Sequence, residues 1–130
     1  KVTEDWEKLK RGVAKLRAAG VKIGLGTDGG GQSGDQFLGW TAHTELEHMV
    51  AAGFTPAEAL VAATRTTAEI MGLDDLGMVA AGKSADFVVL DANPLDDITN
   101  TRKISQVYLR GFRIERERLR TVFMNAAAYK

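Results

Sequence analysis

The stretch Val21-Lys22-Ile23-Gly24-Leu25-Gly26-Thr27-Asp28 decides the fold. Its residues 21–25 form a short apolar run with β-branched side chains, which is typical of a buried strand. The residues before it predict a helix, because apolar side chains recur at helical spacing at Trp6, Leu9, Val13 and Leu16. Gly20 suits the position just after a helix end. A helix followed by a short buried strand is one unit of an α/β fold, and we therefore expect an α/β protein.

Two more helices are expected after the glycine-rich loop that follows Asp28. The first covers about residues 36–52 and is closed by Gly53. The second begins at Thr55-Pro56-Ala57-Glu58, where the threonine caps, the proline takes the first helical position and the glutamate completes a capping box. Gly72 ends this helix. Its buried face is expected to consist of Leu60, Val61, Thr64, Ala68 and Met71.

The pattern changes near residues 73–76, which form the only candidate boundary in the chain. Short strands are predicted at residues 77–79, 85–91 and 104–110, and residues 112–115 are expected to pair with the last of these as a hairpin. The tail from residue 116 to residue 129 has a helical composition.

The composition is that of a soluble globular chain, with 45% hydrophobic and 26% charged residues among 130. The 17 acidic and 17 basic residues cancel, which gives no electrostatic case for nucleic acid or an anionic membrane. Cysteine is absent, so disulfides and thiolate metal sites are excluded. No apolar run approaches the roughly 20 residues that span a bilayer. We expect a cytoplasmic protein, and we interpret Lys1 as an internal start.

A dinucleotide-binding loop is one possible interpretation of the glycines. Gly24, Gly26 and Gly29 match the pattern G-x-G-x-x-G, which brings backbone amides against a pyrophosphate at a helix start. Here the first glycine lies inside the predicted strand, and no helix opens at the motif. The acids about 20 residues further on, Glu45 and Glu47, lie in the middle of a predicted helix rather than at a strand end. The sequence therefore disfavours a nucleotide site.

Asp28 is a better candidate. It lies just past the C-terminal end of the predicted strand, where α/β folds place ligands and catalytic groups. A carboxylate at that place can bind a metal or move a proton. The alternative is that Thr27 and Asp28 only shape a turn or cap a helix. Position alone leaves the two interpretations equally favoured.

The two histidines are a weaker candidate. His43 and His48 are five residues apart, about 140° around a helix, and cannot share a metal as histidines four apart can. His43 and Glu47 do share a face, but a solvated helix face is the favoured interpretation.

Acidic pairs and aromatic residues complete the candidates. Asp74-Asp75 and Asp96-Asp97 lack the ligand spacing of a calcium loop and are expected in solvated turns. Phe37 and Trp40 could line a pocket at the exit of the glycine-rich loop, although core packing is the favoured interpretation of each.

Four segments together resemble the C-terminal third of amidohydrolase superfamily enzymes, closest to the imidazolonepropionase-like and prolidase-like branch. The resemblance runs from about residue 12 to residue 116 and depends on the order and spacing of the segments. The segments are residues 21–28, residues 45–49 with 52–60, residues 62–65, and residues 76–95 with their Gly82-Lys83-Ser84-Ala85-Asp86 motif.

The resemblance implies a fold. Residues 1–75 would form the C-terminal end of a metal-dependent hydrolase barrel, including its last strand and helices. Residues 76–116 would form part of a small composite β-sandwich, and residues 117–130 a helical tail. The fold class implied is α/β, an incomplete part of a (β/α)₈ barrel with part of a sandwich. Asp86 would be a scaffold residue.

The resemblance also implies a function, the hydrolysis of a C–N bond in an amide, cyclic amide or dipeptide-like substrate by metal-activated water. Asp28 would be a ligand of a divalent metal, usually zinc, and the proton shuttle to the leaving nitrogen. Gly29, Gly30, Phe37 and Trp40 would contact the small-molecule substrate.

The other metal ligands of the family are absent from this sequence, which contains no His-x-His pair. The isolated chain is therefore expected to bind metal weakly and to be inactive, because known zinc sites use three or four protein ligands. A strand without neighbours exposes unpaired backbone N–H and C=O groups that can pair with another chain. A homo-oligomer or a segment swap is therefore expected. The alternative function is a non-enzymatic module that oligomerises or binds a partner.

Overall fold

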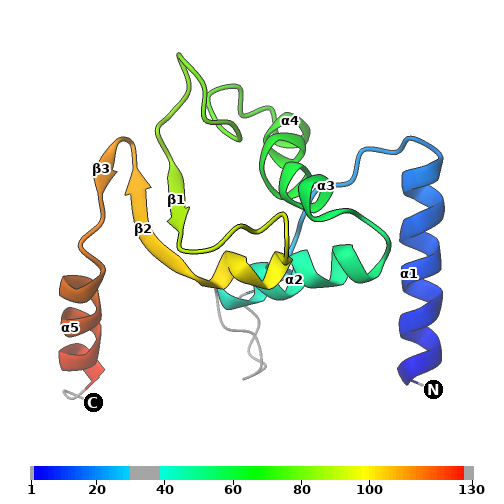
Figure 1. Ribbon diagram of the computed structural model, residues 1–130, viewed down its shortest axis with the longest axis horizontal. Helices are drawn as coiled ribbons and strands as arrows, with labels where there is room; N and C mark the ends of the chain where they lie inside the picture. Colours follow the sequence, from blue (N-terminus) through cyan, green and yellow to red (C-terminus); the bar gives the residue numbers. More distant parts are fainter. Residues whose placement is uncertain (1, 30–38, 128–130) are drawn as a thin grey trace.

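The computed structural model describes residues 2–29 and 39–127. The helices are α1 (Val2–Ala18), α2 (Trp40–Ala51), α3 (Pro56–Val61), α4 (Thr67–Met71) and α5 (Arg116–Ala127). A π-helical turn, Ala62–Thr66, joins α3 to α4, and a 3₁₀ helix spans Ile98–Arg102. The strands are β1 (Phe87–Leu90), β2 (Ile104–Leu109) and β3 (Phe112–Arg113). Figure 1 shows α1 at one edge of the molecule, α5 at the other, and α2, α3 and α4 between them. The mixed α/β class is as predicted.

The core lies where α2 packs against α3 and the 3₁₀ helix. Leu46 and Met49 come from α2, Ala59 from α3 and Ile98 from the 3₁₀ helix, and Phe54 fills the connection between the two α-helices. Ala59 is fully buried because its small side chain lets the two helices approach closely. Partly buried residues of the preceding segments pack against this cluster, namely Val13, Ile23 and Leu25.

The predicted helix ends at Gly20, Gly53 and Gly72 are confirmed, each with a positive φ. At the end of α1 the amide of Gly20 donates to the Arg17 carbonyl, and the amide of Val21 donates to the Leu16 carbonyl. This pair of bonds satisfies the last carbonyls of the helix and requires a positive φ, which is +75° at Gly20. Helix α2 ends in the same way at Gly53, where φ is +100°.

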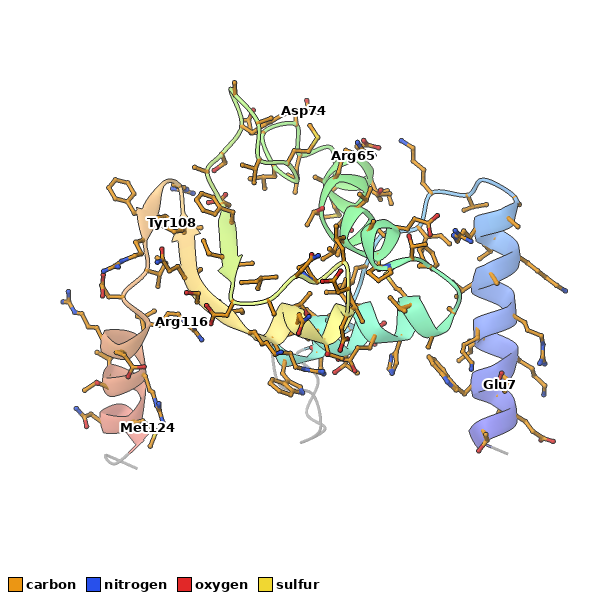
Figure 2. The ribbon with its side chains drawn as sticks, viewed as in Figure 1. Glu7, Arg65, Asp74, Tyr108, Arg116 and Met124 are labelled. Atoms are coloured by element: carbon orange, nitrogen blue, oxygen red, sulfur yellow. The ribbon has the colours of Figure 1, made fainter. Side chains whose placement is uncertain are left out.

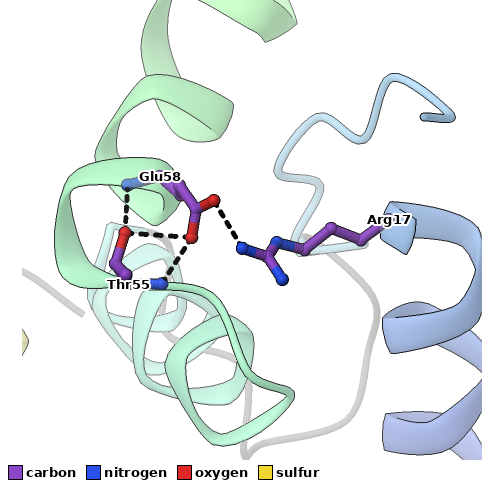
Figure 3. A network of polar contacts seen from close by, with 3 residues as sticks. All are labelled: Arg17, Thr55 and Glu58. Carbon is purple, nitrogen blue, oxygen red and sulfur yellow. Dashed lines mark hydrogen bonds and ion pairs between the residues drawn. The ribbon is translucent and has the colours of Figure 1, made fainter. Parts of the chain in front are cut away.

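The predicted capping box at the start of α3 is also confirmed. The Glu58 amide donates to Thr55 Oγ1 at 3.2 Å, and the Thr55 amide donates to Glu58 Oε2 at 2.7 Å. The other carboxylate oxygen of Glu58 accepts a bond from Arg17 Nη2 at 2.5 Å (Figure 3). One side chain therefore closes the start of α3 and attaches the end of α1 to it.

The buried face of the α3–α4 rod differs from the predicted one. Three residues that were expected in the core are exposed, namely Val61, Thr64 and Met71. Ala68 is buried as predicted, and Ala62 is buried in addition. For Thr64 and Met71 the reason is the π-helical turn, whose wider winding breaks the 3.6-residue spacing on which the prediction was based. Val61 precedes this turn and lies on the exposed side of α3, whereas Ala59 lies on the buried side.

The three strands form one antiparallel sheet in the order β1-β2-β3. Phe87 lies opposite Tyr108, and their rings stack with centroids 4.6 Å apart. The predicted strands at residues 85–91 and 104–110 are confirmed with slightly shorter bounds, and the hairpin partner is reduced to Phe112–Arg113. The predicted strand at residues 77–79 is wrong, because this segment is a bend.

The predicted strand at residues 21–25 is also wrong for the described part of the chain. These residues pair with none of the three described strands. A strand needs a neighbouring backbone to receive its hydrogen bonds. Instead, the Leu25 amide donates to a helix side chain, Thr67 Oγ1, at 3.1 Å. The segment is therefore held by helices rather than by a sheet.

The tail forms a helix as predicted, in α5 up to Ala127. No described helix combines the length and the apolar composition needed to cross a bilayer.

The network around Glu58 predicts a pH dependence of stability. The hydrogen bond from Arg17, followed by the bonds from the Thr55 amide and hydroxyl, lowers the pKa of Glu58 from 4.5 to about 2. A carboxylate whose pKa is lower in the folded state stabilises the fold above the unfolded pKa. That stabilisation is lost as the pH falls from 4.5 toward 2. We expect Arg17→Gln to raise the pKa of Glu58 and to weaken the loss of stability in this range.

An NMR titration of the Glu58 carboxyl, with urea unfolding at pH 7 and pH 3, measures both effects. Arg11→Gln, which changes an exposed arginine on the same helix, is the matched control. An unchanged Glu58 pKa in Arg17→Gln would contradict the assignment.

Candidate functional site

Asp28 lies at the end of the segment that precedes the glycine-rich loop. It is exposed, and its φ of +47° is in the left-handed region, where aspartate is tolerated better than most residues with a side chain. The amide of Gly29 donates to Thr27 Oγ1 at 3.2 Å, which closes a small turn around Asp28. Thr27 therefore shapes the turn, as one interpretation of the sequence proposed, while Asp28 presents its carboxylate from the turn.

The segment reaches this position by close contact with α4. A Cβ atom added at Gly24 would lie 2.9 Å from Thr67 Oγ1 and 3.2 Å from Ile70 Cδ1, so no larger residue fits without movement. Lys22 Nζ binds Glu69 Oε2 at 2.9 Å on the exposed side of the contact. Gly24 is thus explained by helix packing, which removes the main support for the nucleotide interpretation.

The four residues predicted to contact substrate have different outcomes. Gly29 lies in the turn beside Asp28. Gly30 and Phe37 lie outside the described residues. Trp40 begins α2 and is 56% exposed, so the core-packing interpretation is wrong for it. The guanidinium of Arg102 lies 4.7 Å from the centre of the Trp40 ring and explains how this large side chain is held at the surface.

His43 belongs to a polar cluster that the sequence did not reveal. Its Nδ1 lies 3.0 Å from Thr101 Oγ1, and on the same helix Glu47 forms an ion pair with Arg102. Burial lowers the pKa of His43 below 6.5, the positive charge of Arg102 lowers it further, and Glu47 opposes the shift. The solvated-face interpretation is therefore wrong for His43, which is half-buried against the 3₁₀ helix. No local signal could have identified partners that lie more than 50 residues away in the chain.

His48 has a different environment on α2. Its ring centroid is 4.7 Å from that of Trp6 in α1, and its Nδ1 is 3.4 Å from Glu45 Oε1. The two histidines therefore face different elements, as their spacing predicted, and His48 connects α2 to α1.

Two of the remaining acidic residues, Asp97 and Asp86, have structural roles. Asp74-Asp75 and Asp96-Asp97 are exposed, as predicted, and the Asp97 side chain accepts the Thr99 amide at the start of the 3₁₀ helix. Asp86 accepts the Arg110 amide at 2.6 Å and the Ser84 hydroxyl at 2.8 Å. These bonds fasten the start of β1 to the β2–β3 turn, and they support the prediction that Asp86 is a scaffold residue.

A metal requires more ligands than Asp28 supplies. Within residues 2–29 and 39–127, no group of three or more histidine, cysteine or acidic side chains is placed to hold an ion. The described residues therefore do not fit a complete metal site, and Asp28 could contribute at most one ligand to it.

A cleft of about 720 Å³ lies between the α3–α4 rod and the sheet, and Ala63, Leu76, Val88 and Tyr108 are among its lining residues. Asp28 is not among the described residues that line it.

Comparison with known proteins establishes the family. Residues 2–113 match the Amidohydrolase family, and the chain therefore belongs to the amidohydrolase family. The predicted resemblance is confirmed.

Among curated relatives, a 5-methylthioadenosine/S-adenosylhomocysteine deaminase of Moorella thermoacetica is 39% identical over 95 residues, 65% of this chain and 22% of its own length. A deaminase of the same name from Bacillus thuringiensis is 30% identical over 128 residues, 82% of this chain and 29% of its own length. The chain thus spans less than a third of the relatives it matches.

Solved structures of similar fold include a putative prolidase from Bifidobacterium longum, with 43% identity and a TM-score of 0.71 over 82% of this chain and 26% of that one. A Xaa-Pro dipeptidase has 32% identity and a TM-score of 0.71, again over 82% of this chain and 25% of its own. Molinate hydrolase has 34% identity and a TM-score of 0.72 over 79% of this chain and 25% of its own.

The polar cluster around His43 leads to a prediction about how stability depends on pH. Because burial and Arg102 lower the pKa of His43, the neutral imidazole is favoured in the fold. The corresponding stability is present above pH 6.5 and is lost as the pH falls from there toward the folded pKa. We expect Arg102→Gln to raise the pKa of His43, measured by NMR of the imidazole ring protons.

Lys103→Gln, which removes the neighbouring exposed cation, is the control and should leave that titration unchanged. A His43 pKa that stays constant in Arg102→Gln would show that the arginine does not set it.

Proposed function

We propose that this chain is the C-terminal portion of a metal-dependent amidohydrolase that hydrolyses a C–N bond, with Asp28 as its proton shuttle. The observation that carries the proposal is the place of Asp28. It stands at the end of the segment that α4 holds, within the region that matches the family. The names of the relatives and of the similar structures, a deaminase and a Xaa-Pro dipeptidase among them, support this reaction class.

The proposal gives Asp28 two tasks. As a carboxylate it accepts a proton from the attacking water, and as a carboxylic acid it returns that proton to the leaving nitrogen. Asp28 is exposed between the half-buried turn residues Thr27 and Gly29, so its side chain is open to a reactant. A divalent metal, when bound, would acidify the water and polarise the substrate. Because the described residues do not complete a metal site, its remaining ligands would come from other parts of the enzyme.

We propose the same division of the chain as the resemblance implied. Residues 1–75 would contribute to the barrel, residues 76–116 to a composite β-sandwich and residues 117–130 to a tail. The antiparallel sheet of β1, β2 and β3 and the TM-scores of 0.71 to 0.72 support this arrangement. In it, the segment 21–28 would receive its strand neighbours from other parts of the barrel.

The test is a comparison of Asp28→Asn with the unaltered full-length protein. The substrate panel contains 5-methylthioadenosine, a Xaa-Pro dipeptide and a phenylurea, and metal content is measured in parallel. We expect kcat to fall by about 10²- to 10⁴-fold, because the amide cannot carry the proton. Asp96→Asn, in an exposed turn, is the matched control. Full activity of Asp28→Asn would refute the proposed role of Asp28 as the proton shuttle.

The isolated chain is expected to show no turnover of these substrates and to bind metal weakly. Clear turnover by the isolated chain would refute this expectation.

A second candidate is a non-enzymatic module that self-associates, and one observation favours it. Many large apolar side chains are exposed, among them Leu9 at 62%, Met71 at 66%, Val79 at 82%, Phe112 at 77% and Met124 at 67%. Figure 2 shows side chains standing out from α1 and α5 at the two edges of the molecule. The zero net charge gives no reason to expect nucleic acid or a membrane as the partner.

We expect the isolated chain to form homo-oligomers or to swap segments, because exposed apolar surface of this extent favours association. Light scattering at micromolar concentration should give a mass above the 14.0 kDa of one chain. The double variant Leu9→Lys, Leu16→Lys should lower that mass, whereas Lys8→Gln on the same helix should not. A monomeric mass for the unaltered chain would contradict association.

A further inference from the structure

The hydroxyl of Thr67 connects the α3–α4 rod to the segment that carries Asp28. Thr67 Oγ1 accepts a hydrogen bond from the Leu25 amide at 3.1 Å, three residues before Asp28. The contact is partly buried, so water competes with it less than with an exposed bond. A side chain of the helix thus takes the place that a neighbouring strand has in a sheet.

The π-helical turn fixes the direction of this hydroxyl. Thr67 Oγ1 donates its own proton to the Ala62 carbonyl at 2.7 Å, five residues earlier in the chain. A hydroxyl has one proton to donate, and here that proton is committed to the helix. The oxygen therefore presents its lone pairs to the segment, where the Leu25 amide donates to it.

Gly24 brings the segment to this oxygen. A residue with a Cβ atom does not fit without movement, because that atom would lie 2.9 Å from Thr67 Oγ1 and 3.2 Å from Ile70 Cδ1. On either side of Gly24, Ile23 and Leu25 pack against the core cluster. The backbone is thereby held on one side by packing and on the other by the hydroxyl.

We infer that Thr67 is a positioning residue that sets the place of the Asp28 carboxylate for proton transfer. The inference rests on the proposed function, and it extends that function to a residue on a helix that contacts no reacting atom. A proton shuttle is sensitive to such support, because a displacement of about 1 Å can cost about 100-fold in rate. Thr67 acts through the Leu25 amide, and the short connection Gly26-Thr27 transmits the position to Asp28.

The geometric part is tested by hydrogen exchange of the Leu25 amide in the full-length protein. Thr67→Val keeps the shape of the side chain and removes the hydroxyl, so exchange at Leu25 should accelerate at least about tenfold. Thr64→Val is the matched control. Its hydroxyl also donates to a helix carbonyl, Leu60 O at 2.7 Å, and it has no bond to residues 21–29 in the described part of the chain. Equal exchange at Leu25 in both variants would overturn the inference.

The functional part is tested by kinetics with the panel substrate that the unaltered protein hydrolyses. Thr67→Val should lower kcat by about 10- to 100-fold and leave KM within about twofold, because substrate contacts are retained. Thr67→Ser, which restores the hydroxyl, should recover kcat to within about threefold. A merely structural role predicts instead that Thr64→Val and Thr67→Val lose activity together, in proportion to their loss of thermal stability, and that result would overturn the inference.

Gly24→Ala keeps the inference falsifiable if Thr67→Val does not fold. The added methyl group pushes the segment away from Thr67 Oγ1 without altering the helix, so kcat should fall as in Thr67→Val. An unchanged kcat in Gly24→Ala would overturn the inference. Asp28→Asn separates the two proposals. If it is inactive while the Thr67 and Gly24 variants retain full kcat, only the positioning role fails, and if it is fully active, the proposed function fails.

Discussion

The close packing of α2 on α3 around Ala59 is the interaction on which the other contacts of the molecule depend. From this pair, each neighbouring element is attached by a polar contact at its edge. Glu58 at the start of α3 binds α1 through Arg17, and Glu47 on α2 binds the 3₁₀ helix through Arg102. The buried apolar cluster is small, since no large side chain in the described residues is fully buried. The apolar cluster therefore brings the helices together, and the polar contacts orient α1 and the 3₁₀ helix relative to α2 and α3.

The sequence predicted the features whose physics is local. The capping box of Thr55 and Glu58 and the glycine helix ends are determined by residues close in the chain, and they were predicted correctly. The strands around residues 87–90 and 104–109 were also predicted, and each is the pairing partner of the other. The predicted strand at residues 21–25 is absent because pairing depends on a neighbouring strand, which an apolar run cannot specify. The exposed positions Thr64 and Met71 were mistaken because nothing in the sequence marks a π-helical turn.

In the candidate site too, features set by nearby residues were predicted, whereas contacts between distant segments were not. Asp28 was predicted from its place in the chain and from the resemblance, and of these the family resemblance is confirmed. Its support was not identified, because Thr67 lies 42 residues from Leu25 and has no motif of its own. The contact of His43 with Thr101 was missed for the same reason, at a separation of 58 residues. Polar contacts between distant segments have no periodic signal, and these are the contacts that place the side chains of the site.

The π-helical turn Ala62–Thr66 also has a consequence for how this region could vary in length. Helices α3 and α4 follow each other without a loop, and the wider π turn takes up one extra residue between them. Removing one residue from the turn would restore ordinary α-helical winding, and α4 would keep nearly its present direction around the axis of the rod. The Ala62 carbonyl would then lie four residues before Thr67 instead of five, which is the usual spacing for a threonine that bonds back to its own helix. A deletion of one residue is therefore expected to shorten the rod without separating the Asp28 segment from the Thr67 hydroxyl.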